Sequence, residues 1–195
     1  MSARLLSFVL AIASAAAFVS APRATQPDAT RAPATVDGTH SSLLFKVRHL
    51  ETTNFYGRFN KISGDVALDD KGGSVNIEVD ADSVDTNNAK RDGHLKSQDF
   101  FSAKEFPKIA FKSKSATKKG DGWEVAGDLS LHGVTKPLTV TVKATGSGSD
   151  PMGKKLGYES TFSFKRSDYG MSYGVDNNAL GDEVTVILAV EAIAK

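Results

Sequence analysis

Cysteine is absent from the 195 residues of this chain. Its absence excludes disulfide bonds, thiolate metal ligands, a cysteine nucleophile and the lipid-modified cysteine that anchors a lipoprotein. A strong net charge is also absent, since 24 Lys and Arg balance 23 Asp and Glu and the lysines are scattered along the chain. Binding to a phosphate backbone requires a basic stripe. We therefore expect no nucleic acid among the partners.

Long apolar runs are absent except at the start of the chain, which reads MSARLLSFVLAIASAAAFVSA over residues 1–21. Arg4 precedes the apolar stretch, and small residues at Ala17 and Ala21 end it. This pattern is typical of a cleaved secretory signal peptide. A membrane anchor is the competing interpretation, but serines and alanines make the stretch short and weakly hydrophobic. We therefore expect export and a location in the periplasm.

Residues 22–35 follow with three of the six prolines and no apolar period. Such a composition is typical of a disordered linker. Residues 36–195 then form the folded domain. Without disulfides, its stability has to come from an apolar core.

From Val36 onward, apolar and polar residues alternate, which is the period of a β-strand with one buried face. Eight segments show the alternation: 43–49, 59–68, 75–79, 109–115, 123–131, 138–142, 158–164 and 184–190. The connections are short, so neighbouring strands are expected to be antiparallel and to close into an eight-stranded barrel. The polar partners are Lys, Glu, Thr and Ser, which directs the apolar face inward and leaves water outside. A two-sheet sandwich would give the same alternation and remains an alternative fold.

The loops of the expected barrel divide into two groups. The hairpin-like loops 69–73, 118–122 and 146–155 fall at one end. The longer connections around 50–57, 82–106, 132–137 and 166–182 collect at the other end. Because function concentrates on such loops, we place the mouth of the barrel there.

The segment 87–101, NNAKRDGHLKSQDFF, is the most heavily charged of these connections. Asn87 or Asn88 is suited to cap a short helix, and the apolar residues that follow would point inward. The segment is therefore interpreted as a helical lid over the mouth. Gly93 leaves open a second arrangement of two short pieces hinged at that glycine.

Six separated stretches of this sequence resemble the YceI-like family of secreted polyisoprenoid-binding proteins. They are VDGTHSSLLFKVRHL, GRFNKISGDVALD, RDGHLKSQDFFSAKEFPKIAFKS, GDLSLHGVTKPLTVTV, RSDYG and LGDEVTVILAVEA. They occur in the family's order and span roughly residues 36–195. The resemblance implies a lipocalin-like barrel that holds an isoprenoid lipid, such as a polyprenyl phosphate or an isoprenoid quinone, for storage or transport.

Inward positions on the strands and under the lid are the expected ligand contacts. They are Phe45, Val47, His49, Phe59, Leu95, Phe100, Phe101, Phe111, Leu129, Phe162 and Phe164. Arg91, His94 and Arg166 are the candidates for contacts with a polar head group. Glycines such as Gly57 and Gly127 would either leave room for the ligand or mark bulges and bends. A membrane or a membrane protein is a further candidate for transient contact.

Two other classes of function stay open. An enzyme at the rim would use His49, His94 and His132, but these histidines lack metal-ligand spacing, and a structural hydrogen bond is the favoured interpretation of each. Arg166 continues the inward face and calls for an anionic ligand or a carboxylate such as Asp168 or Asp92. We expect no catalytic residue, metal or cofactor. The second alternative is a barrel whose loops bind a protein partner.

Overall fold

The structure is a computed structural model in which residues 32–194 are described. The predicted signal peptide, and the predicted linker as far as residue 31, lie outside these residues. The end of the predicted linker requires a correction, because Ala34 and Thr35 belong to strand β1 (Ala34–Val36). Ala34 is buried in the core, and β1 pairs with both β4 and β11. The folded domain therefore begins before Val36.

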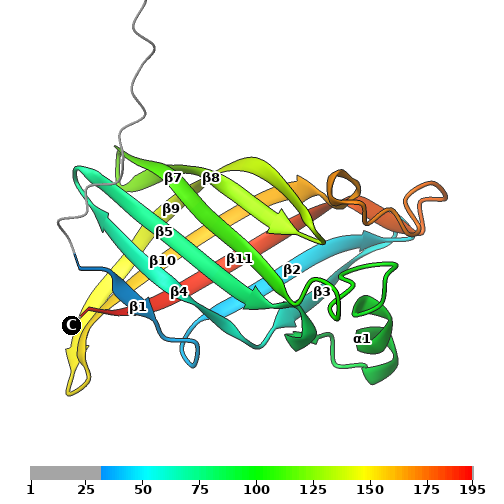
Figure 1. Ribbon diagram of the computed structural model, residues 1–195, viewed down its shortest axis with the longest axis horizontal. Coiled ribbons are helices and arrows are strands. Elements are labelled where there is room, and N and C mark those ends of the chain that lie inside the picture. Colours follow the sequence, from blue (N-terminus) through cyan, green and yellow to red (C-terminus); the bar gives the residue numbers. More distant parts are fainter. Residues whose placement is uncertain (1–31, 195) are drawn as a thin grey trace, which may run out of the picture.

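The other strands follow in antiparallel order. They are β2 (Ser42–His49), β3 (Thr53–Phe59), β4 (Ile62–Asp69), β5 (Gly72–Asp80), β6 (Val84–Asp85), β7 (Lys108–Lys119), β8 (Gly122–Leu131), β9 (Val134–Asp150), β10 (Gly153–Lys165) and β11 (Leu180–Ala194). β1 and β2 lie in succession along β11, while β3 and β4 pair with β2 and β1. The segments thus form an eight-stranded ring that β1 closes (Figure 1). The predicted barrel is confirmed, and the sandwich alternative is wrong.

The stretch predicted as one strand over 59–68 is interrupted at Asn60 and Lys61. There the main chain pairs with the short helix η1 (Ala81–Ser83) instead of a strand. The Asn60 amide donates a hydrogen bond to the Ser83 carbonyl at 3.1 Å, and the Lys61 amide donates one to Ser83 Oγ at 3.1 Å. Phe59 and Ile62 are both buried although three positions separate them. The alternation therefore changes phase at this bend, and both halves keep their apolar side inward.

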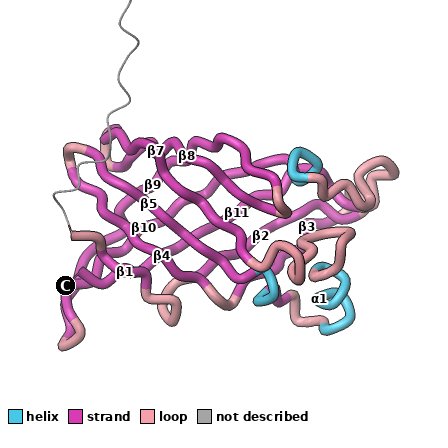
Figure 2. The backbone as a smooth tube through the Cα atoms, in the orientation of Figure 1, coloured by secondary structure: helices cyan, strands magenta, loops and turns pink. Residues whose placement is uncertain are grey.

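The two ends of the barrel differ (Figures 1 and 2). Tight turns join β4 to β5, β7 to β8 and β9 to β10 at one end, where Trp123 Nε1 donates to the Asp69 carbonyl at 2.7 Å. The other end carries helix α1 (Ala89–Leu95), helix η2 (Arg166–Tyr169) and the long loop 170–179. The predicted division of the loops between the two ends is confirmed, but their bounds are wrong: residues 53–57 belong to β3, 134–137 and 146–150 to β9, and 153–155 to β10. Within residues 32–194, no helix has the length and apolar character needed to cross a membrane.

Candidate ligand-binding cavity

A cavity of about 590 Å³ lies in the barrel interior and extends from the mouth past the middle of the barrel, as far as Val75 and Val142. Side chains from β2, β3, β5, β7, β8, β9, β10 and β11 line it, and most of them are apolar. The cavity reaches the exposed residues Thr53, Asn54 and Tyr173 at the mouth. Its volume falls within the range of small-molecule sites, roughly 300–1,000 Å³. The interior therefore has space for one apolar ligand.

The structure brings all of the predicted site residues to this cavity. The wall carries Phe45, Val47, His49, Phe59, Phe111, Leu129, Phe162 and Phe164, the lid carries Leu95, Phe100 and Phe101, and Arg91, His94 and Arg166 also line it. Sequence reasoning missed the contribution of the loop 170–179, which adds Met171, Tyr173 and Ala179. The alternation that identifies inward strand residues is absent from an irregular loop, so these residues gave no signal.

Two glycines explain why the aromatic side chains do not fill the barrel. Phe45 pairs across the strands with Gly57, and a Cβ at Gly57 would lie 2.2 Å from Cζ of the Phe45 ring. A Cβ at Gly127 would lie 2.4 Å from the Lys112 carbonyl oxygen and 2.7 Å from Cζ of the Phe111 ring, which lies diagonally across the strands. Each ring thus lies against the wall, over main chain that has no side chain. The space beside these two glycines is filled by the Phe45 and Phe111 rings, which therefore do not project into the cavity.

Gly57→Ala should therefore reduce the space available to a ligand. The new methyl group would push the Phe45 ring into the cavity, and excluding about two methylene groups of ligand should weaken binding about tenfold. Gly93→Ala is a matched control, because nothing lies within 4 Å of its Cβ and alanine favours the helix. Titration with a fluorescent prenyl analogue checks both. Equal binding by wild type and Gly57→Ala would contradict this explanation.

The lid is built around Thr86. The carboxylate of Asp92 accepts hydrogen bonds from the Thr86 amide and hydroxyl, while Arg91 donates to Thr86 Oγ1 and to its carbonyl, both at 2.8 Å. The Asn88 side chain accepts from the Arg91 amide at 3.0 Å, so Asn88 is the cap. Helix α1 continues through Gly93 without a break, and the hinged alternative is wrong. These contacts fix the start of the lid to the end of β6.

The underside of the lid packs on the barrel. The Phe101 ring lies 5.2 Å from the Phe59 ring between centroids, and Leu95 packs against the same core. At the mouth, the His94 ring lies 5.0 Å from those of Phe100 and Tyr173. This three-ring cluster joins the lid to the loop 170–179. The predicted apolar underside is confirmed, and lid and loop together cover the cavity.

The two arginines at the mouth are held in different ways. The Arg91 guanidinium lies 4.3 Å from the centre of the Phe55 ring at the cavity wall. Arg166 is 4% exposed and donates to the carbonyls of Met171, Leu180 and Gly181 at 2.8–3.0 Å. Burial lowers the pKa of Arg166, and the charge of nearby Asp182 opposes this effect.

The carboxylates expected to pair with Arg166 do not do so. Asp168 lies 3.4 Å from Lys136, and Asp92 is engaged by Thr86. Main-chain carbonyls replace a carboxylate because the chain from Met171 to Gly181 wraps around the guanidinium. Arg166 therefore holds the mouth loop in place while it borders the cavity.

The three rim histidines lie in separate surroundings. His94 Nε2 is 2.8 Å from the Asp99 carboxylate, and His132 Nδ1 is 2.9 Å from the Tyr169 carbonyl. His49 lies at the end of β2 and lines the cavity. Within residues 32–194, one group of His and carboxylate side chains is close enough to share a metal ion. It lies toward the opposite end of the barrel, and none of the three rim histidines belongs to it.

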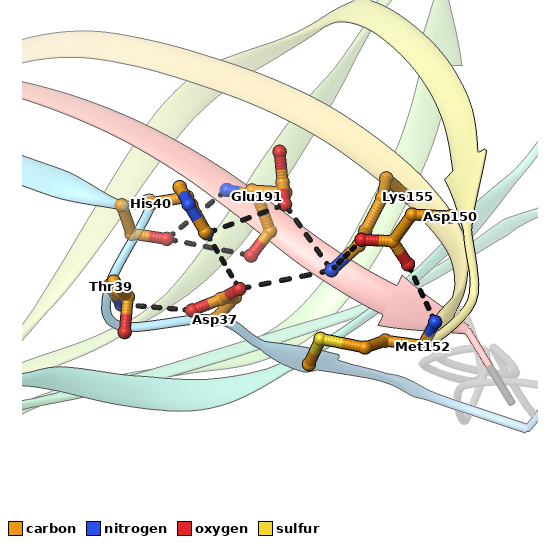
Figure 3. A network of polar contacts seen from close by, with 8 residues as sticks. Asp37, Thr39, His40, Asp150, Met152, Lys155 and Glu191 are labelled. Atoms are coloured by element: carbon orange, nitrogen blue, oxygen red, sulfur yellow. Dashed lines mark hydrogen bonds and ion pairs between the residues drawn. The ribbon is translucent and has the colours of Figure 1, made fainter.

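That group consists of Asp37, His40 and Glu191, and it is joined by Lys155 (Figure 3). His40 Nδ1 lies 2.9 Å from the Asp37 carboxylate. The Lys155 ammonium lies 3.9 Å from Asp37 and 3.6 Å from Glu191. A cation of the chain thus already lies between the two carboxylates. The cluster ties the segment after β1 to β10 and β11, where the ring closes.

The pKa of His40 is raised from its ordinary value of 6.5, first by its hydrogen bond to Asp37 and then by the charge of Asp37. Folding favours the protonated form of His40. Protonated His40 therefore stabilises the folded protein below pH 6.5, and this contribution is lost as the pH rises through the raised pKa. Urea unfolding between pH 6 and pH 8.5 should show a decline that His40→Gln removes. An identical decline in wild type and variant would contradict this assignment.

The fold and the cavity together define an antiparallel barrel that encloses an apolar cavity under a lid. The comparisons with known proteins agree. The YceI-like domain model matches residues 35–192, and the chain belongs to this family. A UPF0312 protein of Yersinia pestis (strain Pestoides F) is 38% identical over 161 residues, which are 80% of this chain and 83% of that protein.

Solved structures show the same fold. BcnA of Burkholderia cenocepacia has a TM-score of 0.74 at 24% identity, covering 80% of this chain and 99% of its own. The YceI protein of Campylobacter jejuni has a TM-score of 0.67 at 28% identity, covering 77% and 91%. A polyisoprenoid binding domain from Saccharophagus degradans has a TM-score of 0.63 at 17% identity, covering 83% and 98%. Family and cavity support the binding of a hydrophobic ligand.

Proposed function

We propose that this protein binds one isoprenoid lipid inside the barrel and stores or carries it in the periplasm after export. The apolar cavity of about 590 Å³ is the observation that carries the proposal. The solved domain described as polyisoprenoid binding, from Saccharophagus degradans, supports the choice of ligand class. Enclosing roughly ten methylene groups contributes about 8 kcal/mol before ordering costs. Apolar contact alone thus gives useful affinity.

A polar head group would lie at the mouth. Arg91 and His94 line the cavity there, beside the rings of Phe55 and Tyr173. A cation and an imidazole suit the phosphate of a polyprenyl phosphate or the carbonyl oxygens of an isoprenoid quinone. Arg166 contributes less, because three of its donors already bind main-chain carbonyls.

Binding without catalysis fits the mouth better than an enzyme does. Asp92 does not line the cavity and is engaged by Thr86, and Arg166 is engaged by main-chain carbonyls. General acid or base catalysis needs a titratable group within reach of the substrate and free to exchange a proton. The side chains at the mouth instead hold the lid and the loop 170–179 together.

Titration with isoprenoid alcohols of increasing chain length tests the proposal. A fluorescent prenyl analogue serves as the probe, and each alcohol is added as a competitor. We expect saturation at one probe per chain and an affinity that rises with chain length until the cavity is filled. Absence of saturable binding would overturn the proposal, as would chemical conversion of the bound isoprenoid.

A further inference from the structure

The outer face of the β2–β3 hairpin combines cations with exposed apolar side chains. Lys46 on β2 pairs across the strands with Tyr56 on β3, and Leu44 pairs with Arg58. Tyr56 is 52% exposed and Leu44 is 38% exposed. Arg48 follows Lys46 on the same face and is exposed. We call this set of five side chains the hairpin face.

Two of the three cations of the hairpin face, Lys46 and Arg48, have no carboxylate within ion-pair distance in the described part of the chain, whereas Arg58 pairs across the strands with Asp85 on β6 and its charge acts on that carboxyl. Within residues 32–194, no carboxylate lies within 4.0 Å of Lys46, Arg48 or Arg58, although many other lysines of the barrel are paired, as Lys114 and Lys119 are at 2.7 Å. Arg48 donates to a main-chain carbonyl, that of Glu51, at 2.7 Å. The face therefore presents the positive charges of Lys46 and Arg48, which no ion pair within residues 32–194 neutralises, beside an Arg58 that Asp85 partly offsets.

The turn at the end of this hairpin projects a further apolar side chain. Leu50 is 56% exposed and has φ 47°, and Glu51 has φ 54°, a region that residues other than glycine rarely adopt. The Leu50 amide donates to the Ala179 carbonyl at 3.0 Å, which fixes the turn to the loop 170–179. Tyr173 of that loop is 50% exposed at the rim.

Exposed large apolar residues are thus concentrated on one side. Five are found in residues 32–194, and Leu44, Leu50, Tyr56 and Tyr173 lie on the hairpin face or the rim. The fifth, Met152, lies in the β9–β10 turn at the opposite end, which Figure 1 shows far from β2 and β3. Leu44, Leu50 and Tyr56 face solvent, so packing within the chain does not explain their exposure, whereas Tyr173 also packs against His94 and Phe100.

We propose that the hairpin face, with Leu50 and Tyr173 at its end, docks on an anionic lipid bilayer. Unpaired cations attract acidic head groups, and aromatic and aliphatic side chains enter the interfacial region. Tyr173 lines the cavity, as do His49 and Ala179, which adjoin Leu50, so docking brings the mouth to the bilayer surface. An apolar ligand then passes between membrane and barrel without crossing water. The transfer of a ligand rests on the proposed function, whereas the docking of the protein on the bilayer does not.

Vesicle sedimentation tests the charge. The chain is mixed with vesicles of phosphatidylcholine alone or with 30 mole per cent phosphatidylglycerol, a composition of about one anionic lipid in three. We expect binding to the anionic vesicles that weakens with salt. The triple variant Lys46→Gln, Arg48→Gln, Arg58→Gln should lose on the order of 100-fold in affinity. The matched triple Lys71→Gln, Lys143→Gln, Lys154→Gln removes the same charge from exposed positions elsewhere and should bind as wild type does.

A label tests the orientation. Because the chain has no cysteine, Leu50→Cys and Met152→Cys each give a single site for an environment-sensitive fluorophore. Anionic vesicles should shift the emission to the blue at position 50 and leave it unchanged at position 152. Every variant carries the same N-terminal segment, so differences between them report on the labelled or substituted position.

Three results would overturn the docking proposal: no binding to anionic vesicles, equal losses in the two triple variants, or a shift at position 152 without one at position 50. Binding of the fluorescent prenyl analogue is measured separately, without vesicles. Loss of prenyl binding in wild type with docking intact would refute the proposed function alone. Capture by a protein surface instead of vesicles would count against the lipid bilayer as the partner.

Discussion

Phe45→Asp is expected to lower the free energy of unfolding by about 4 kcal/mol or more and to abolish ligand retention. Phe45 is 8% exposed, lies over Gly57 and packs against Phe59 with 5.7 Å between ring centroids. Aspartate removes this packing and places a carboxylate where the cross-strand partner is a glycine and the neighbours are aromatic. Urea unfolding at neutral pH measures the loss.

Thr161→Asp is the control for this substitution. Thr161 is exposed on the outer side of β10, so a carboxylate there stays in water, and we expect a change within about 0.5 kcal/mol. Because inward-facing and outward-facing residues alternate along the strands, Phe45→Asp and Thr161→Asp compare the inner face of the barrel wall with its outer face. Comparable destabilisation by both substitutions would show that the inward assignment is wrong.

The double variant Leu95→Ser, Phe101→Ser is expected to release a bound prenyl analogue at least about tenfold faster than wild type. Both side chains lie under the lid, and Phe101 contacts Phe59 in the barrel wall. Their loss leaves the lid held mainly by the contacts around Thr86 and by the ring cluster at the mouth. Stopped-flow dissociation, compared at equal folded fraction, measures the rate.

The control for the lid changes its outer surface instead. Lys90→Gln with Lys104→Gln alters one exposed residue of the lid and one exposed residue just after it, and should leave the dissociation rate unchanged. If the lysine substitutions changed the release rate while the substitutions of Leu95 and Phe101 had no effect, charged groups rather than the apolar underside of the lid would retain the ligand.

The alternation of apolar residues explains why the barrel and its inward side chains could be predicted. Phe162 and Phe164 were assigned to the interior by period alone, and both line the cavity. The bend at Asn60 and Lys61 was missed because it depends on Ser83, more than twenty residues away in the chain. The sequence did contain one sign of this bend: the alternation of apolar and polar residues changes phase between Phe59 and Ile62.

Contacts between distant segments were beyond the reach of sequence patterns. Arg166 was correctly placed inward, but its partners are carbonyls whose positions depend on the path of the loop 170–179. The cluster of Asp37, His40, Lys155 and Glu191 joins residues about 150 positions apart, as the Ser41–Glu191 hydrogen bonds do. Only closure of the ring brings them together.

Organic extraction of the protein purified from the cells that make it, followed by mass spectrometry, tests the central claim most directly. The account predicts one isoprenoid lipid at close to one molecule per chain, and a clear reduction of that amount in the Leu95→Ser, Phe101→Ser variant. Wild-type protein that carries no lipid, or a mixture of unrelated lipids at far below one per chain, would contradict it.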